Sequence, residues 1–150
     1  MRLRDANVAA TANREGGVLA ERCVFSAGAF VDMSPVAHFD KHLMKSSISA
    51  VGSTLYASGL RHIYLRCSPG EALKRCHRRN RKSESAYTLA YLRGLHVAHD
   101  RSFGTLSRRG RVVVVDVTDL SKGAVLAAVV AACRQLGMPL QRNRRRIVTA

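Results

Sequence analysis

Several residue types are scarce in this 150-residue sequence. It has no tryptophan, and aromatic residues make up only 5% of the chain. Few side chains are therefore available for stacking on exposed nucleic-acid bases. The four cysteines form no Cys-x-x-Cys pair and no zinc-finger spacing. We therefore expect a reduced, intracellular chain without structural zinc.

Long apolar runs are also absent. The longest, Ala124 to Cys133, is far short of the ~20 residues that span a bilayer. The first residues lack the apolar core of a secretory signal. We expect no membrane span and a cytoplasmic location, with mitochondrial or nuclear targeting as alternatives.

Acidic residues are few, 10 against 25 basic residues, which gives a net charge of +15. Such a charge predicts polyanionic partners, either nucleotides, nucleic acid or an anionic surface. A merely soluble basic surface is the simpler alternative. The length and the 47% apolar content fit one globular domain over residues 1–140, followed by a basic tail at 141–150.

Three short apolar runs predict β-strands, at residues 18–20, 62–66 and 112–117. Runs that are apolar on both faces are typical of a parallel sheet covered on both sides. Helical patterns lie between and after them. The predicted order is strand, helix, strand, helices, strand, helix, which indicates an α/β fold.

Two later segments carry apolar stripes at helical spacing. The final helix is predicted to begin after Ser121 and to end before Gly137, and we expect it to be core. Its stripe consists of Val125, Leu126, Val129, Val130 and Cys133. In residues 88–103, His96 and His99 lie on such a stripe. Without an obvious third ligand, they are interpreted as structural histidines and not as metal ligands.

Residues 68–84 carry the strongest chemical signal. Ser68, Pro69 and Glu71 form a capping-box pattern with proline at the first helical position. Six cations follow between Lys74 and Lys82, and four of them are arginine. Like charges at this spacing repel, and arginine favours bidentate contact with phosphate. The segment is therefore predicted to clamp phosphate, with a solvated basic helix as the alternative.

A second group follows the first predicted strand, where Glu21 and Arg22 are adjacent. In a parallel sheet this position is the carboxyl edge, where open α/β proteins bind ligands. An acid there commonly holds Mg²⁺ in phosphate-transfer enzymes, and the arginine can orient a substrate hydroxyl.

Together these motifs resemble the deoxynucleoside kinase family, which includes thymidine kinase 2, deoxycytidine kinase and the insect multisubstrate enzymes. The resemblance runs from about Val18 to Val117. The matching residues are Glu21-Arg22-Cys23-Val-Phe-Ser26-Ala27, Tyr64-Leu65-Arg66-Cys-Ser68-Pro69, Arg75-x3-Arg79-x-Arg81-x2-Glu84 and Leu89-x-Tyr91-Leu92-x2-Leu95-His96-x2-His99-Asp100.

The resemblance implies a P-loop kinase-like parallel sheet with flanking helices, and phosphorylation of a deoxynucleoside by ATP and Mg²⁺. It implies that Glu21 serves Mg²⁺ and that Arg22 reaches the nucleoside 5′-hydroxyl. By the same resemblance Glu84 binds the sugar 3′-hydroxyl, and Ala27 favours pyrimidine substrates, including thymidine. The lid arginines that close over ATP and neutralise the transferring phosphoryl group are Arg75, Arg79 and Arg81. A homodimer formed through helices is also implied.

The sequence departs from the family in one major respect. These 150 residues contain no Gly-x4-Gly-Lys-Ser/Thr loop, whose backbone and lysine hold the β- and γ-phosphates. The family's upstream Glu-Pro segment, which carries the general base, and its first, central strand are missing too. We expect exposed strand edges as a result. The alternatives are therefore an inactive relic, a partner subunit of an intact kinase, or a basic nucleic-acid-binding module that uses the clusters at 74–82, 108–111 and 142–146.

Overall fold

The structure is a computed structural model that describes residues 21, 23–57, 59–108 and 110–138. The predicted strand at residues 18–20, the basic tail and Arg22 lie outside the described residues. Within them, two strands form a parallel sheet, β1 (His62–Arg66) and β2 (Val112–Asp116). Their register runs from His62 beside Val112 to Arg66 beside Asp116. Both strands match the sequence prediction, apart from the last residue of the second.

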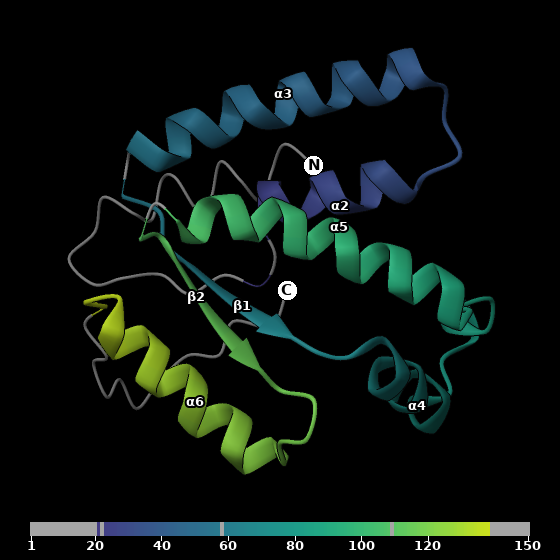
Figure 1. The fold of residues 1–150 in the computed structure, drawn as a ribbon, viewed down its shortest axis with the longest axis vertical. Coiled ribbons are helices and arrows are strands. Elements are labelled where there is room, and N and C mark those ends of the chain that lie inside the picture. Colours follow the sequence, from purple (N-terminus) through teal and green to yellow (C-terminus); the bar gives the residue numbers. More distant parts are fainter. Residues whose placement is uncertain (1–20, 22, 58, 109, 139–150) are drawn as a thin grey trace.

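Helices cover both faces of this sheet (Figure 1). On one face lies α5 (Leu89–Ser107), with α2 (Val24–Met33) between it and α3 (His38–Ala57). On the other face lies α6 (Lys122–Gln135). The short α4 (Pro69–Arg79) and a 3-10 turn, η1 (Lys82–Glu84), follow the carboxyl end of β1. The predicted α/β fold with a parallel sheet and flanking helices is confirmed for this part of the chain.

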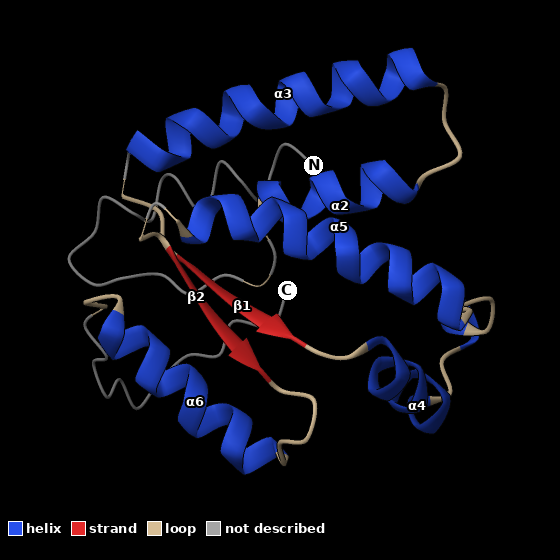
Figure 2. Cartoon of the chain, viewed as in Figure 1, coloured by secondary structure: helices blue, strands red, loops and turns tan. Residues whose placement is uncertain are grey.

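Within the described residues, two helices precede β1 (Figure 2), where one helical segment was predicted. The break falls at Ser34, whose backbone is extended, with φ −77° and ψ 150°. Pro35 follows, and a proline disfavours the helical conformation for the residue before it. Close packing then holds the two helices together, because Gly52 of α3 lies directly against the ring of Phe25 in α2. The sequence prediction missed this division of the segment.

The core lies between the sheet and α5. Buried Phe103, Leu106 and Val112 form its centre, and Phe25 and Tyr64 pack against it. The rings of Tyr64 and Phe103 stack with their centroids 4.9 Å apart. Offset aromatic pairs at this distance add to the stabilisation that burial provides. This packing fixes the orientation of β1, whose last residues contribute to the site.

The final helix is only partly core. Ser121 caps it by accepting a hydrogen bond from the Ala124 N–H at 3.3 Å, and Gly137 ends it with φ 68°, both as predicted. Cys133 is 2% exposed, but Leu126 is 66% exposed. The prediction that the whole apolar stripe is buried is therefore wrong. Two described strands are too narrow a surface to cover the full width of that stripe.

Candidate functional site

Helix α4 begins with a side-chain cap at the end of β1. Ser68 Oγ accepts a hydrogen bond from the Glu71 N–H at 3.4 Å, and Pro69 lies in the first turn, as predicted. The reciprocal half of the capping box is not formed. The Ser68 N–H donates to Thr118 Oγ1 at 3.0 Å, and the Glu71 carboxylate accepts from Arg75 Nε at 3.0 Å. The prediction of a full capping box is wrong because the Ser68 N–H and the Glu71 carboxylate each have another partner.

Arg75 ties this helix to the loop that follows β2. Its Nη2 donates to the carbonyl oxygens of Val117 and Thr118, at 2.8 and 2.9 Å. Its side chain is 30% exposed. None of its described hydrogen bonds uses Nη1, which leaves that nitrogen for a ligand oxygen. Arg75 therefore has a structural role in addition to the nucleotide contact that the resemblance implies.

The other two lid arginines surround Glu84. Arg79 donates from Nε and Nη2 to Glu84 Oε2, at 3.0 and 2.6 Å, and Arg81 Nη1 lies 3.8 Å from Oε1. The chain turns between them at Asn80, whose φ of 50° is left-handed, a conformation that asparagine tolerates. The Glu84 side chain is only 12% exposed, whereas that of Arg81 is 65% exposed. The structure thus brings together three of the predicted site residues, Arg79, Arg81 and Glu84.

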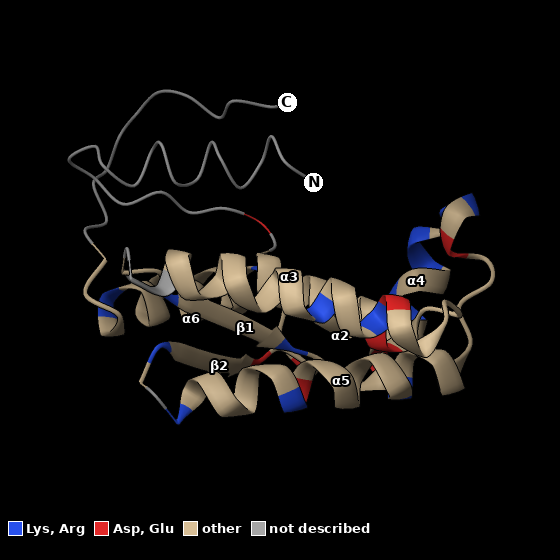
Figure 3. Cartoon of the chain, turned by 90° about the horizontal axis from the view of Figure 1, so that it is seen from above, with Lys and Arg blue, Asp and Glu red and all other residues tan. Residues whose placement is uncertain are grey.

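Three more cations of the lid, Lys74, Arg78 and Lys82, are exposed. None of them forms an ion pair with a carboxylate in the described part of the chain. Figure 3 shows the basic residues of α4 at one end of the molecule. The lid segment, residues 68–84, carries more positive charge than Glu71 and Glu84 can neutralise. It can therefore attract an anion.

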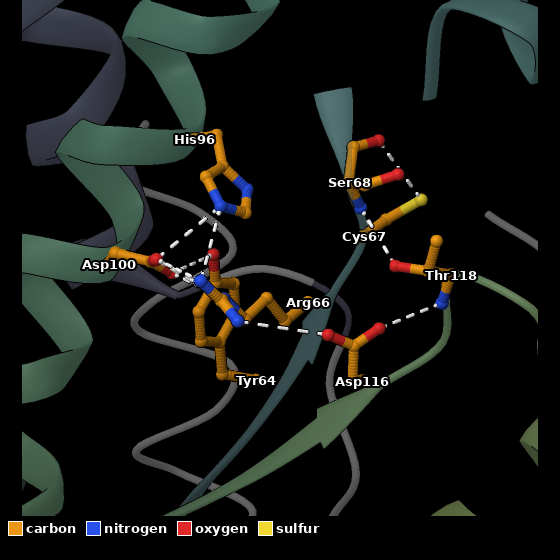
Figure 4. Close-up of polar contacts among 8 residues, drawn as sticks. All are labelled: Tyr64, Arg66, Cys67, Ser68, His96, Asp100, Asp116 and Thr118. Atoms are coloured by element: carbon orange, nitrogen blue, oxygen red, sulfur yellow. Dashed lines mark hydrogen bonds and ion pairs between the residues drawn. The ribbon is translucent and has the colours of Figure 1, made fainter. Parts of the chain in front are cut away.

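A polar network lies beside the lid, at the carboxyl ends of the two strands (Figure 4). Arg66, the last residue of β1, binds Asp100 of α5 through Nη2 to Oδ2 at 2.8 Å and Nε to Oδ1 at 3.1 Å. Tyr64 Oη donates to the same Oδ1 at 3.0 Å. His96 Nε2 lies 3.4 Å from Asp100 Oδ2. This network fixes α5 against the end of β1.

Asp116 extends the network to the end of β2. Its Oδ2 lies 3.7 Å from Arg66 Nη1, and its Oδ1 accepts a hydrogen bond from the Thr118 N–H at 2.9 Å. Since Thr118 Oγ1 also accepts from the Ser68 N–H, the two strand ends and the start of α4 are joined. This strand-end network links both strands and α5 to the start of the lid.

The contacts shift the pKa values of these groups. Burial alone raises the pKa of Asp100, but hydrogen bonds from Arg66 and Tyr64 and the charge of nearby His96 outweigh it, so the net shift is downward. Hydrogen bonding by Thr118 lowers the pKa of Asp116. Burial, and then the hydrogen bond to Asp100, raises the pKa of Tyr64. Both carboxyl groups are therefore ionised, and Tyr64 is a neutral donor, at neutral pH.

Glu21 is not brought to the lid. It is exposed and precedes α2, whose first turn packs through Phe25 against His62, with ring centroids 5.4 Å apart. His62 is the first residue of β1, whereas the lid follows the last. The strand that would place Glu21 at the predicted carboxyl edge lies outside the described residues. Ala27 is half-buried in the middle of α2.

The fit of ATP and Mg²⁺ to these residues differs. Exposed arginine donors fit nucleotide phosphates. For the metal, the described residues contain no group of three or more His, Cys, Asp or Glu side chains placed to hold an ion. Mg²⁺ is usually held by one or two carboxylates together with substrate phosphates. Glu21 alone could then serve only a metal that arrives with the nucleotide.

Sequence reasoning missed the network of Arg66, Asp100, Tyr64 and Asp116 as part of the site. Arg66 is the last residue of one predicted strand and Asp116 the last but one of another, and strand ends in a parallel sheet lie at the ligand-binding edge. That signal was present in the sequence. Asp100, 34 residues from Arg66, could not be paired with it from spacing alone.

None of the helices in the described part of the chain is long and apolar enough to cross a membrane. No curated protein matches the chain significantly. The family model for deoxynucleoside kinase matches residues 2–134, a longer stretch than the motifs quoted above. This match, together with the parallel sheet and the lid at its carboxyl end, shows that the chain belongs to the deoxynucleoside kinase family.

Proposed function

We propose that the chain transfers a phosphoryl group from ATP to the 5′-hydroxyl of a deoxynucleoside. The observation that carries this proposal is the arrangement of Arg79, Arg81 and Glu84 on one short segment after β1. Two guanidinium groups there can neutralise a transferring phosphoryl group, which is the main electrostatic requirement of such reactions. The match to the family supports the same chemistry.

The residues have separate roles in this proposal. Arg79 and Arg81 bind phosphate oxygens, and Arg75 adds its Nη1. By resemblance, Glu21 is a ligand of Mg²⁺, whose charge offsets that of the phosphates when it is bound. Arg22 and Ala27 belong to the nucleoside side, with thymidine or another pyrimidine as the substrate.

Glu84 requires a change of partner in this scheme. Its Oε2 forms an ion pair with Arg79 Nη2 at 2.6 Å, and its side chain is 12% exposed. A nucleotide phosphate that draws Arg79 away releases Glu84 to accept a hydrogen bond from the sugar 3′-hydroxyl. Binding of the two substrates is then coupled through one ion pair.

An inactive relic or partner subunit is the second candidate. In its favour, the 150 residues contain no Gly-x4-Gly-Lys-Ser/Thr motif to hold the β- and γ-phosphates. An assay of phosphate transfer from ATP to thymidine and to deoxycytidine separates the two. We expect the 5′-monophosphate to form with the parent chain and to be lost with Arg79→Gln. No product above that variant, for either nucleoside, would favour the inactive form.

The proposed homodimer has one observation in its favour. Phe39 and Leu43, one turn apart on α3, are 74% and 59% exposed. Residues at this spacing lie on the same side of a helix, and a second copy would cover both. Sedimentation velocity tests this: the Phe39→Ser, Leu43→Ser double variant should shift from dimer to monomer. A monomeric parent chain would rule the dimer out.

A further inference from the structure

Four arginines lie at the end of the sheet opposite the lid. Arg61 and Arg111 immediately precede β1 and β2. The His62 N–H donates to the Arg111 carbonyl oxygen at 2.9 Å, and His62 is in register with Val112. Arg61 and Arg111 are therefore neighbours on adjacent strand ends, which lie about 4.8 Å apart in a sheet.

The other two arginines come from helix ends. Arg108 caps α5, which is followed by β2, and Arg134 lies in the last turn of α6. Since α6 starts after the carboxyl end of β2 and runs back along the sheet, its last turn lies near the strand starts (Figure 1). Figure 3 shows basic residues gathered around the beginning of β2. We call Arg61, Arg108, Arg111 and Arg134 the amino-end cluster.

The simplest explanation for such residues is that they balance helix dipoles. Three helices, α3, α5 and α6, end on this side, and each carries about half a negative charge there. That accounts for about half of the positive charge on Arg61, Arg108 and Arg134. Among the described residues, Arg61, Arg108 and Arg134 form no ion pair with a carboxylate. An excess of positive charge remains.

The surroundings of the cluster favour one class of partner. Arg61, Arg108 and Arg134 are exposed, and no large hydrophobic side chain is exposed in the described segments that carry them, residues 59–62, 107–108, 110–111 and 132–137. Binding to a membrane surface draws on apolar insertion as well as charge. Binding to single strands draws on aromatic stacking. The phosphate backbone of a duplex requires only the cations.

We propose that the amino-end cluster binds the phosphate backbone of a nucleic-acid duplex, without base specificity and independently of the lid. This surface was not visible in the sequence, where the basic clusters at 74–82, 108–111 and 142–146 stood out. Arg61 and Arg134 are isolated in the sequence and join Arg108 and Arg111 only through the fold.

Binding of a labelled 20-base-pair duplex, measured by fluorescence anisotropy between 50 and 200 mM salt, tests the proposal. The test variant is Arg61→Gln, Arg108→Gln, Arg134→Gln. The control is Lys74→Gln, Arg78→Gln, Lys82→Gln, which removes the same charge from exposed lid positions. We expect the test variant to lose about tenfold or more in affinity at 0.1 M salt, and its slope of log affinity against log salt to fall by about 0.9 per lost phosphate contact.

The control variant should keep at least half of the parent's affinity. Equal losses in the two variants would mean that only net charge matters and would overturn the proposal. Binding of phosphatidylserine vesicles without binding of the duplex would overturn it as well. Thermal unfolding of the test variant should match that of the parent, since all three side chains are exposed.

Discussion

Arg66 and Asp100, 34 residues apart, are joined by two parallel hydrogen bonds at 2.8 and 3.1 Å, and they fix α5 to the end of β1. The pair is reinforced by Tyr64, whose hydroxyl shares Oδ1 of the carboxylate. Such bidentate arginine–carboxylate contacts combine charge with fixed geometry. The lid therefore follows a strand end whose orientation relative to α5 depends on this contact.

Replacement of Asp100 with asparagine should weaken this attachment of α5 to β1. The asparagine side chain would keep the shape but lose the charge, and we expect the midpoint of thermal unfolding to fall by about 2–4 °C. Tyr64→Phe is the matched control, because it removes one hydrogen bond and keeps the ring that stacks on Phe103. Its midpoint should fall by less. Equal midpoints for Asp100→Asn and the parent chain would show that the pair is not stabilising.

The two carboxylates at the strand ends predict how stability depends on pH. The pKa values of Asp100 and Asp116 are lowered in the folded chain, so the unfolded chain binds protons first as the pH falls. Their stabilisation is complete above the ordinary aspartate pKa of about 4 and is lost as the pH drops through the lowered values.

Urea unfolding midpoints measured from pH 6 to pH 2.5 test this dependence. The Asp100→Asn, Asp116→Asn double variant should be less stable than the parent at pH 6, and its midpoint should change less below pH 4. Parallel curves for the two proteins would assign the acid sensitivity to other groups.

Arg75 should contribute to stability as well as to nucleotide binding. Its Nη2 satisfies the carbonyl oxygens of Val117 and Thr118. We expect Arg75→Gln to lower the free energy of unfolding by about 1–2 kcal/mol, because two charge-assisted hydrogen bonds are lost. Chemical denaturation measures this. Arg78→Gln, an exposed position one turn away on the same helix, is the control and should change stability little.

Glu84 should restrain Arg79 until nucleotide binds. Glu84→Gln removes the charge that holds the Arg79 guanidinium, so we expect ATP to bind up to about fivefold more tightly. The same variant should bind nucleoside more weakly, because the proposed acceptor of the 3′-hydroxyl is lost. Isothermal titration with each ligand separately measures both effects. Weaker ATP binding in Glu84→Gln would contradict the exchange of partners.

Local signals in the sequence were sufficient for several elements. Ser68, Pro69 and Ser121 mark helix starts that the structure confirms, since a cap depends only on residues within one turn. Long-range features were not accessible in this way. Which side of α6 meets the sheet depends on the width of the sheet, so Leu126 was predicted buried and is exposed. The pairing of Arg66 with Asp100, and of Arg75 with the loop after β2, likewise depends on tertiary packing.

The most direct test of the central claim is hydrogen exchange over residues 68–84 with ATP and Mg²⁺ at millimolar concentration. If the lid binds nucleotide phosphates, amides around Arg75, Arg79 and Arg81 should exchange more slowly with ATP, and the Arg79→Gln, Arg81→Gln variant should lose that protection. A duplex oligonucleotide should leave the lid unchanged. Protection of the lid by the duplex and not by ATP would contradict the account.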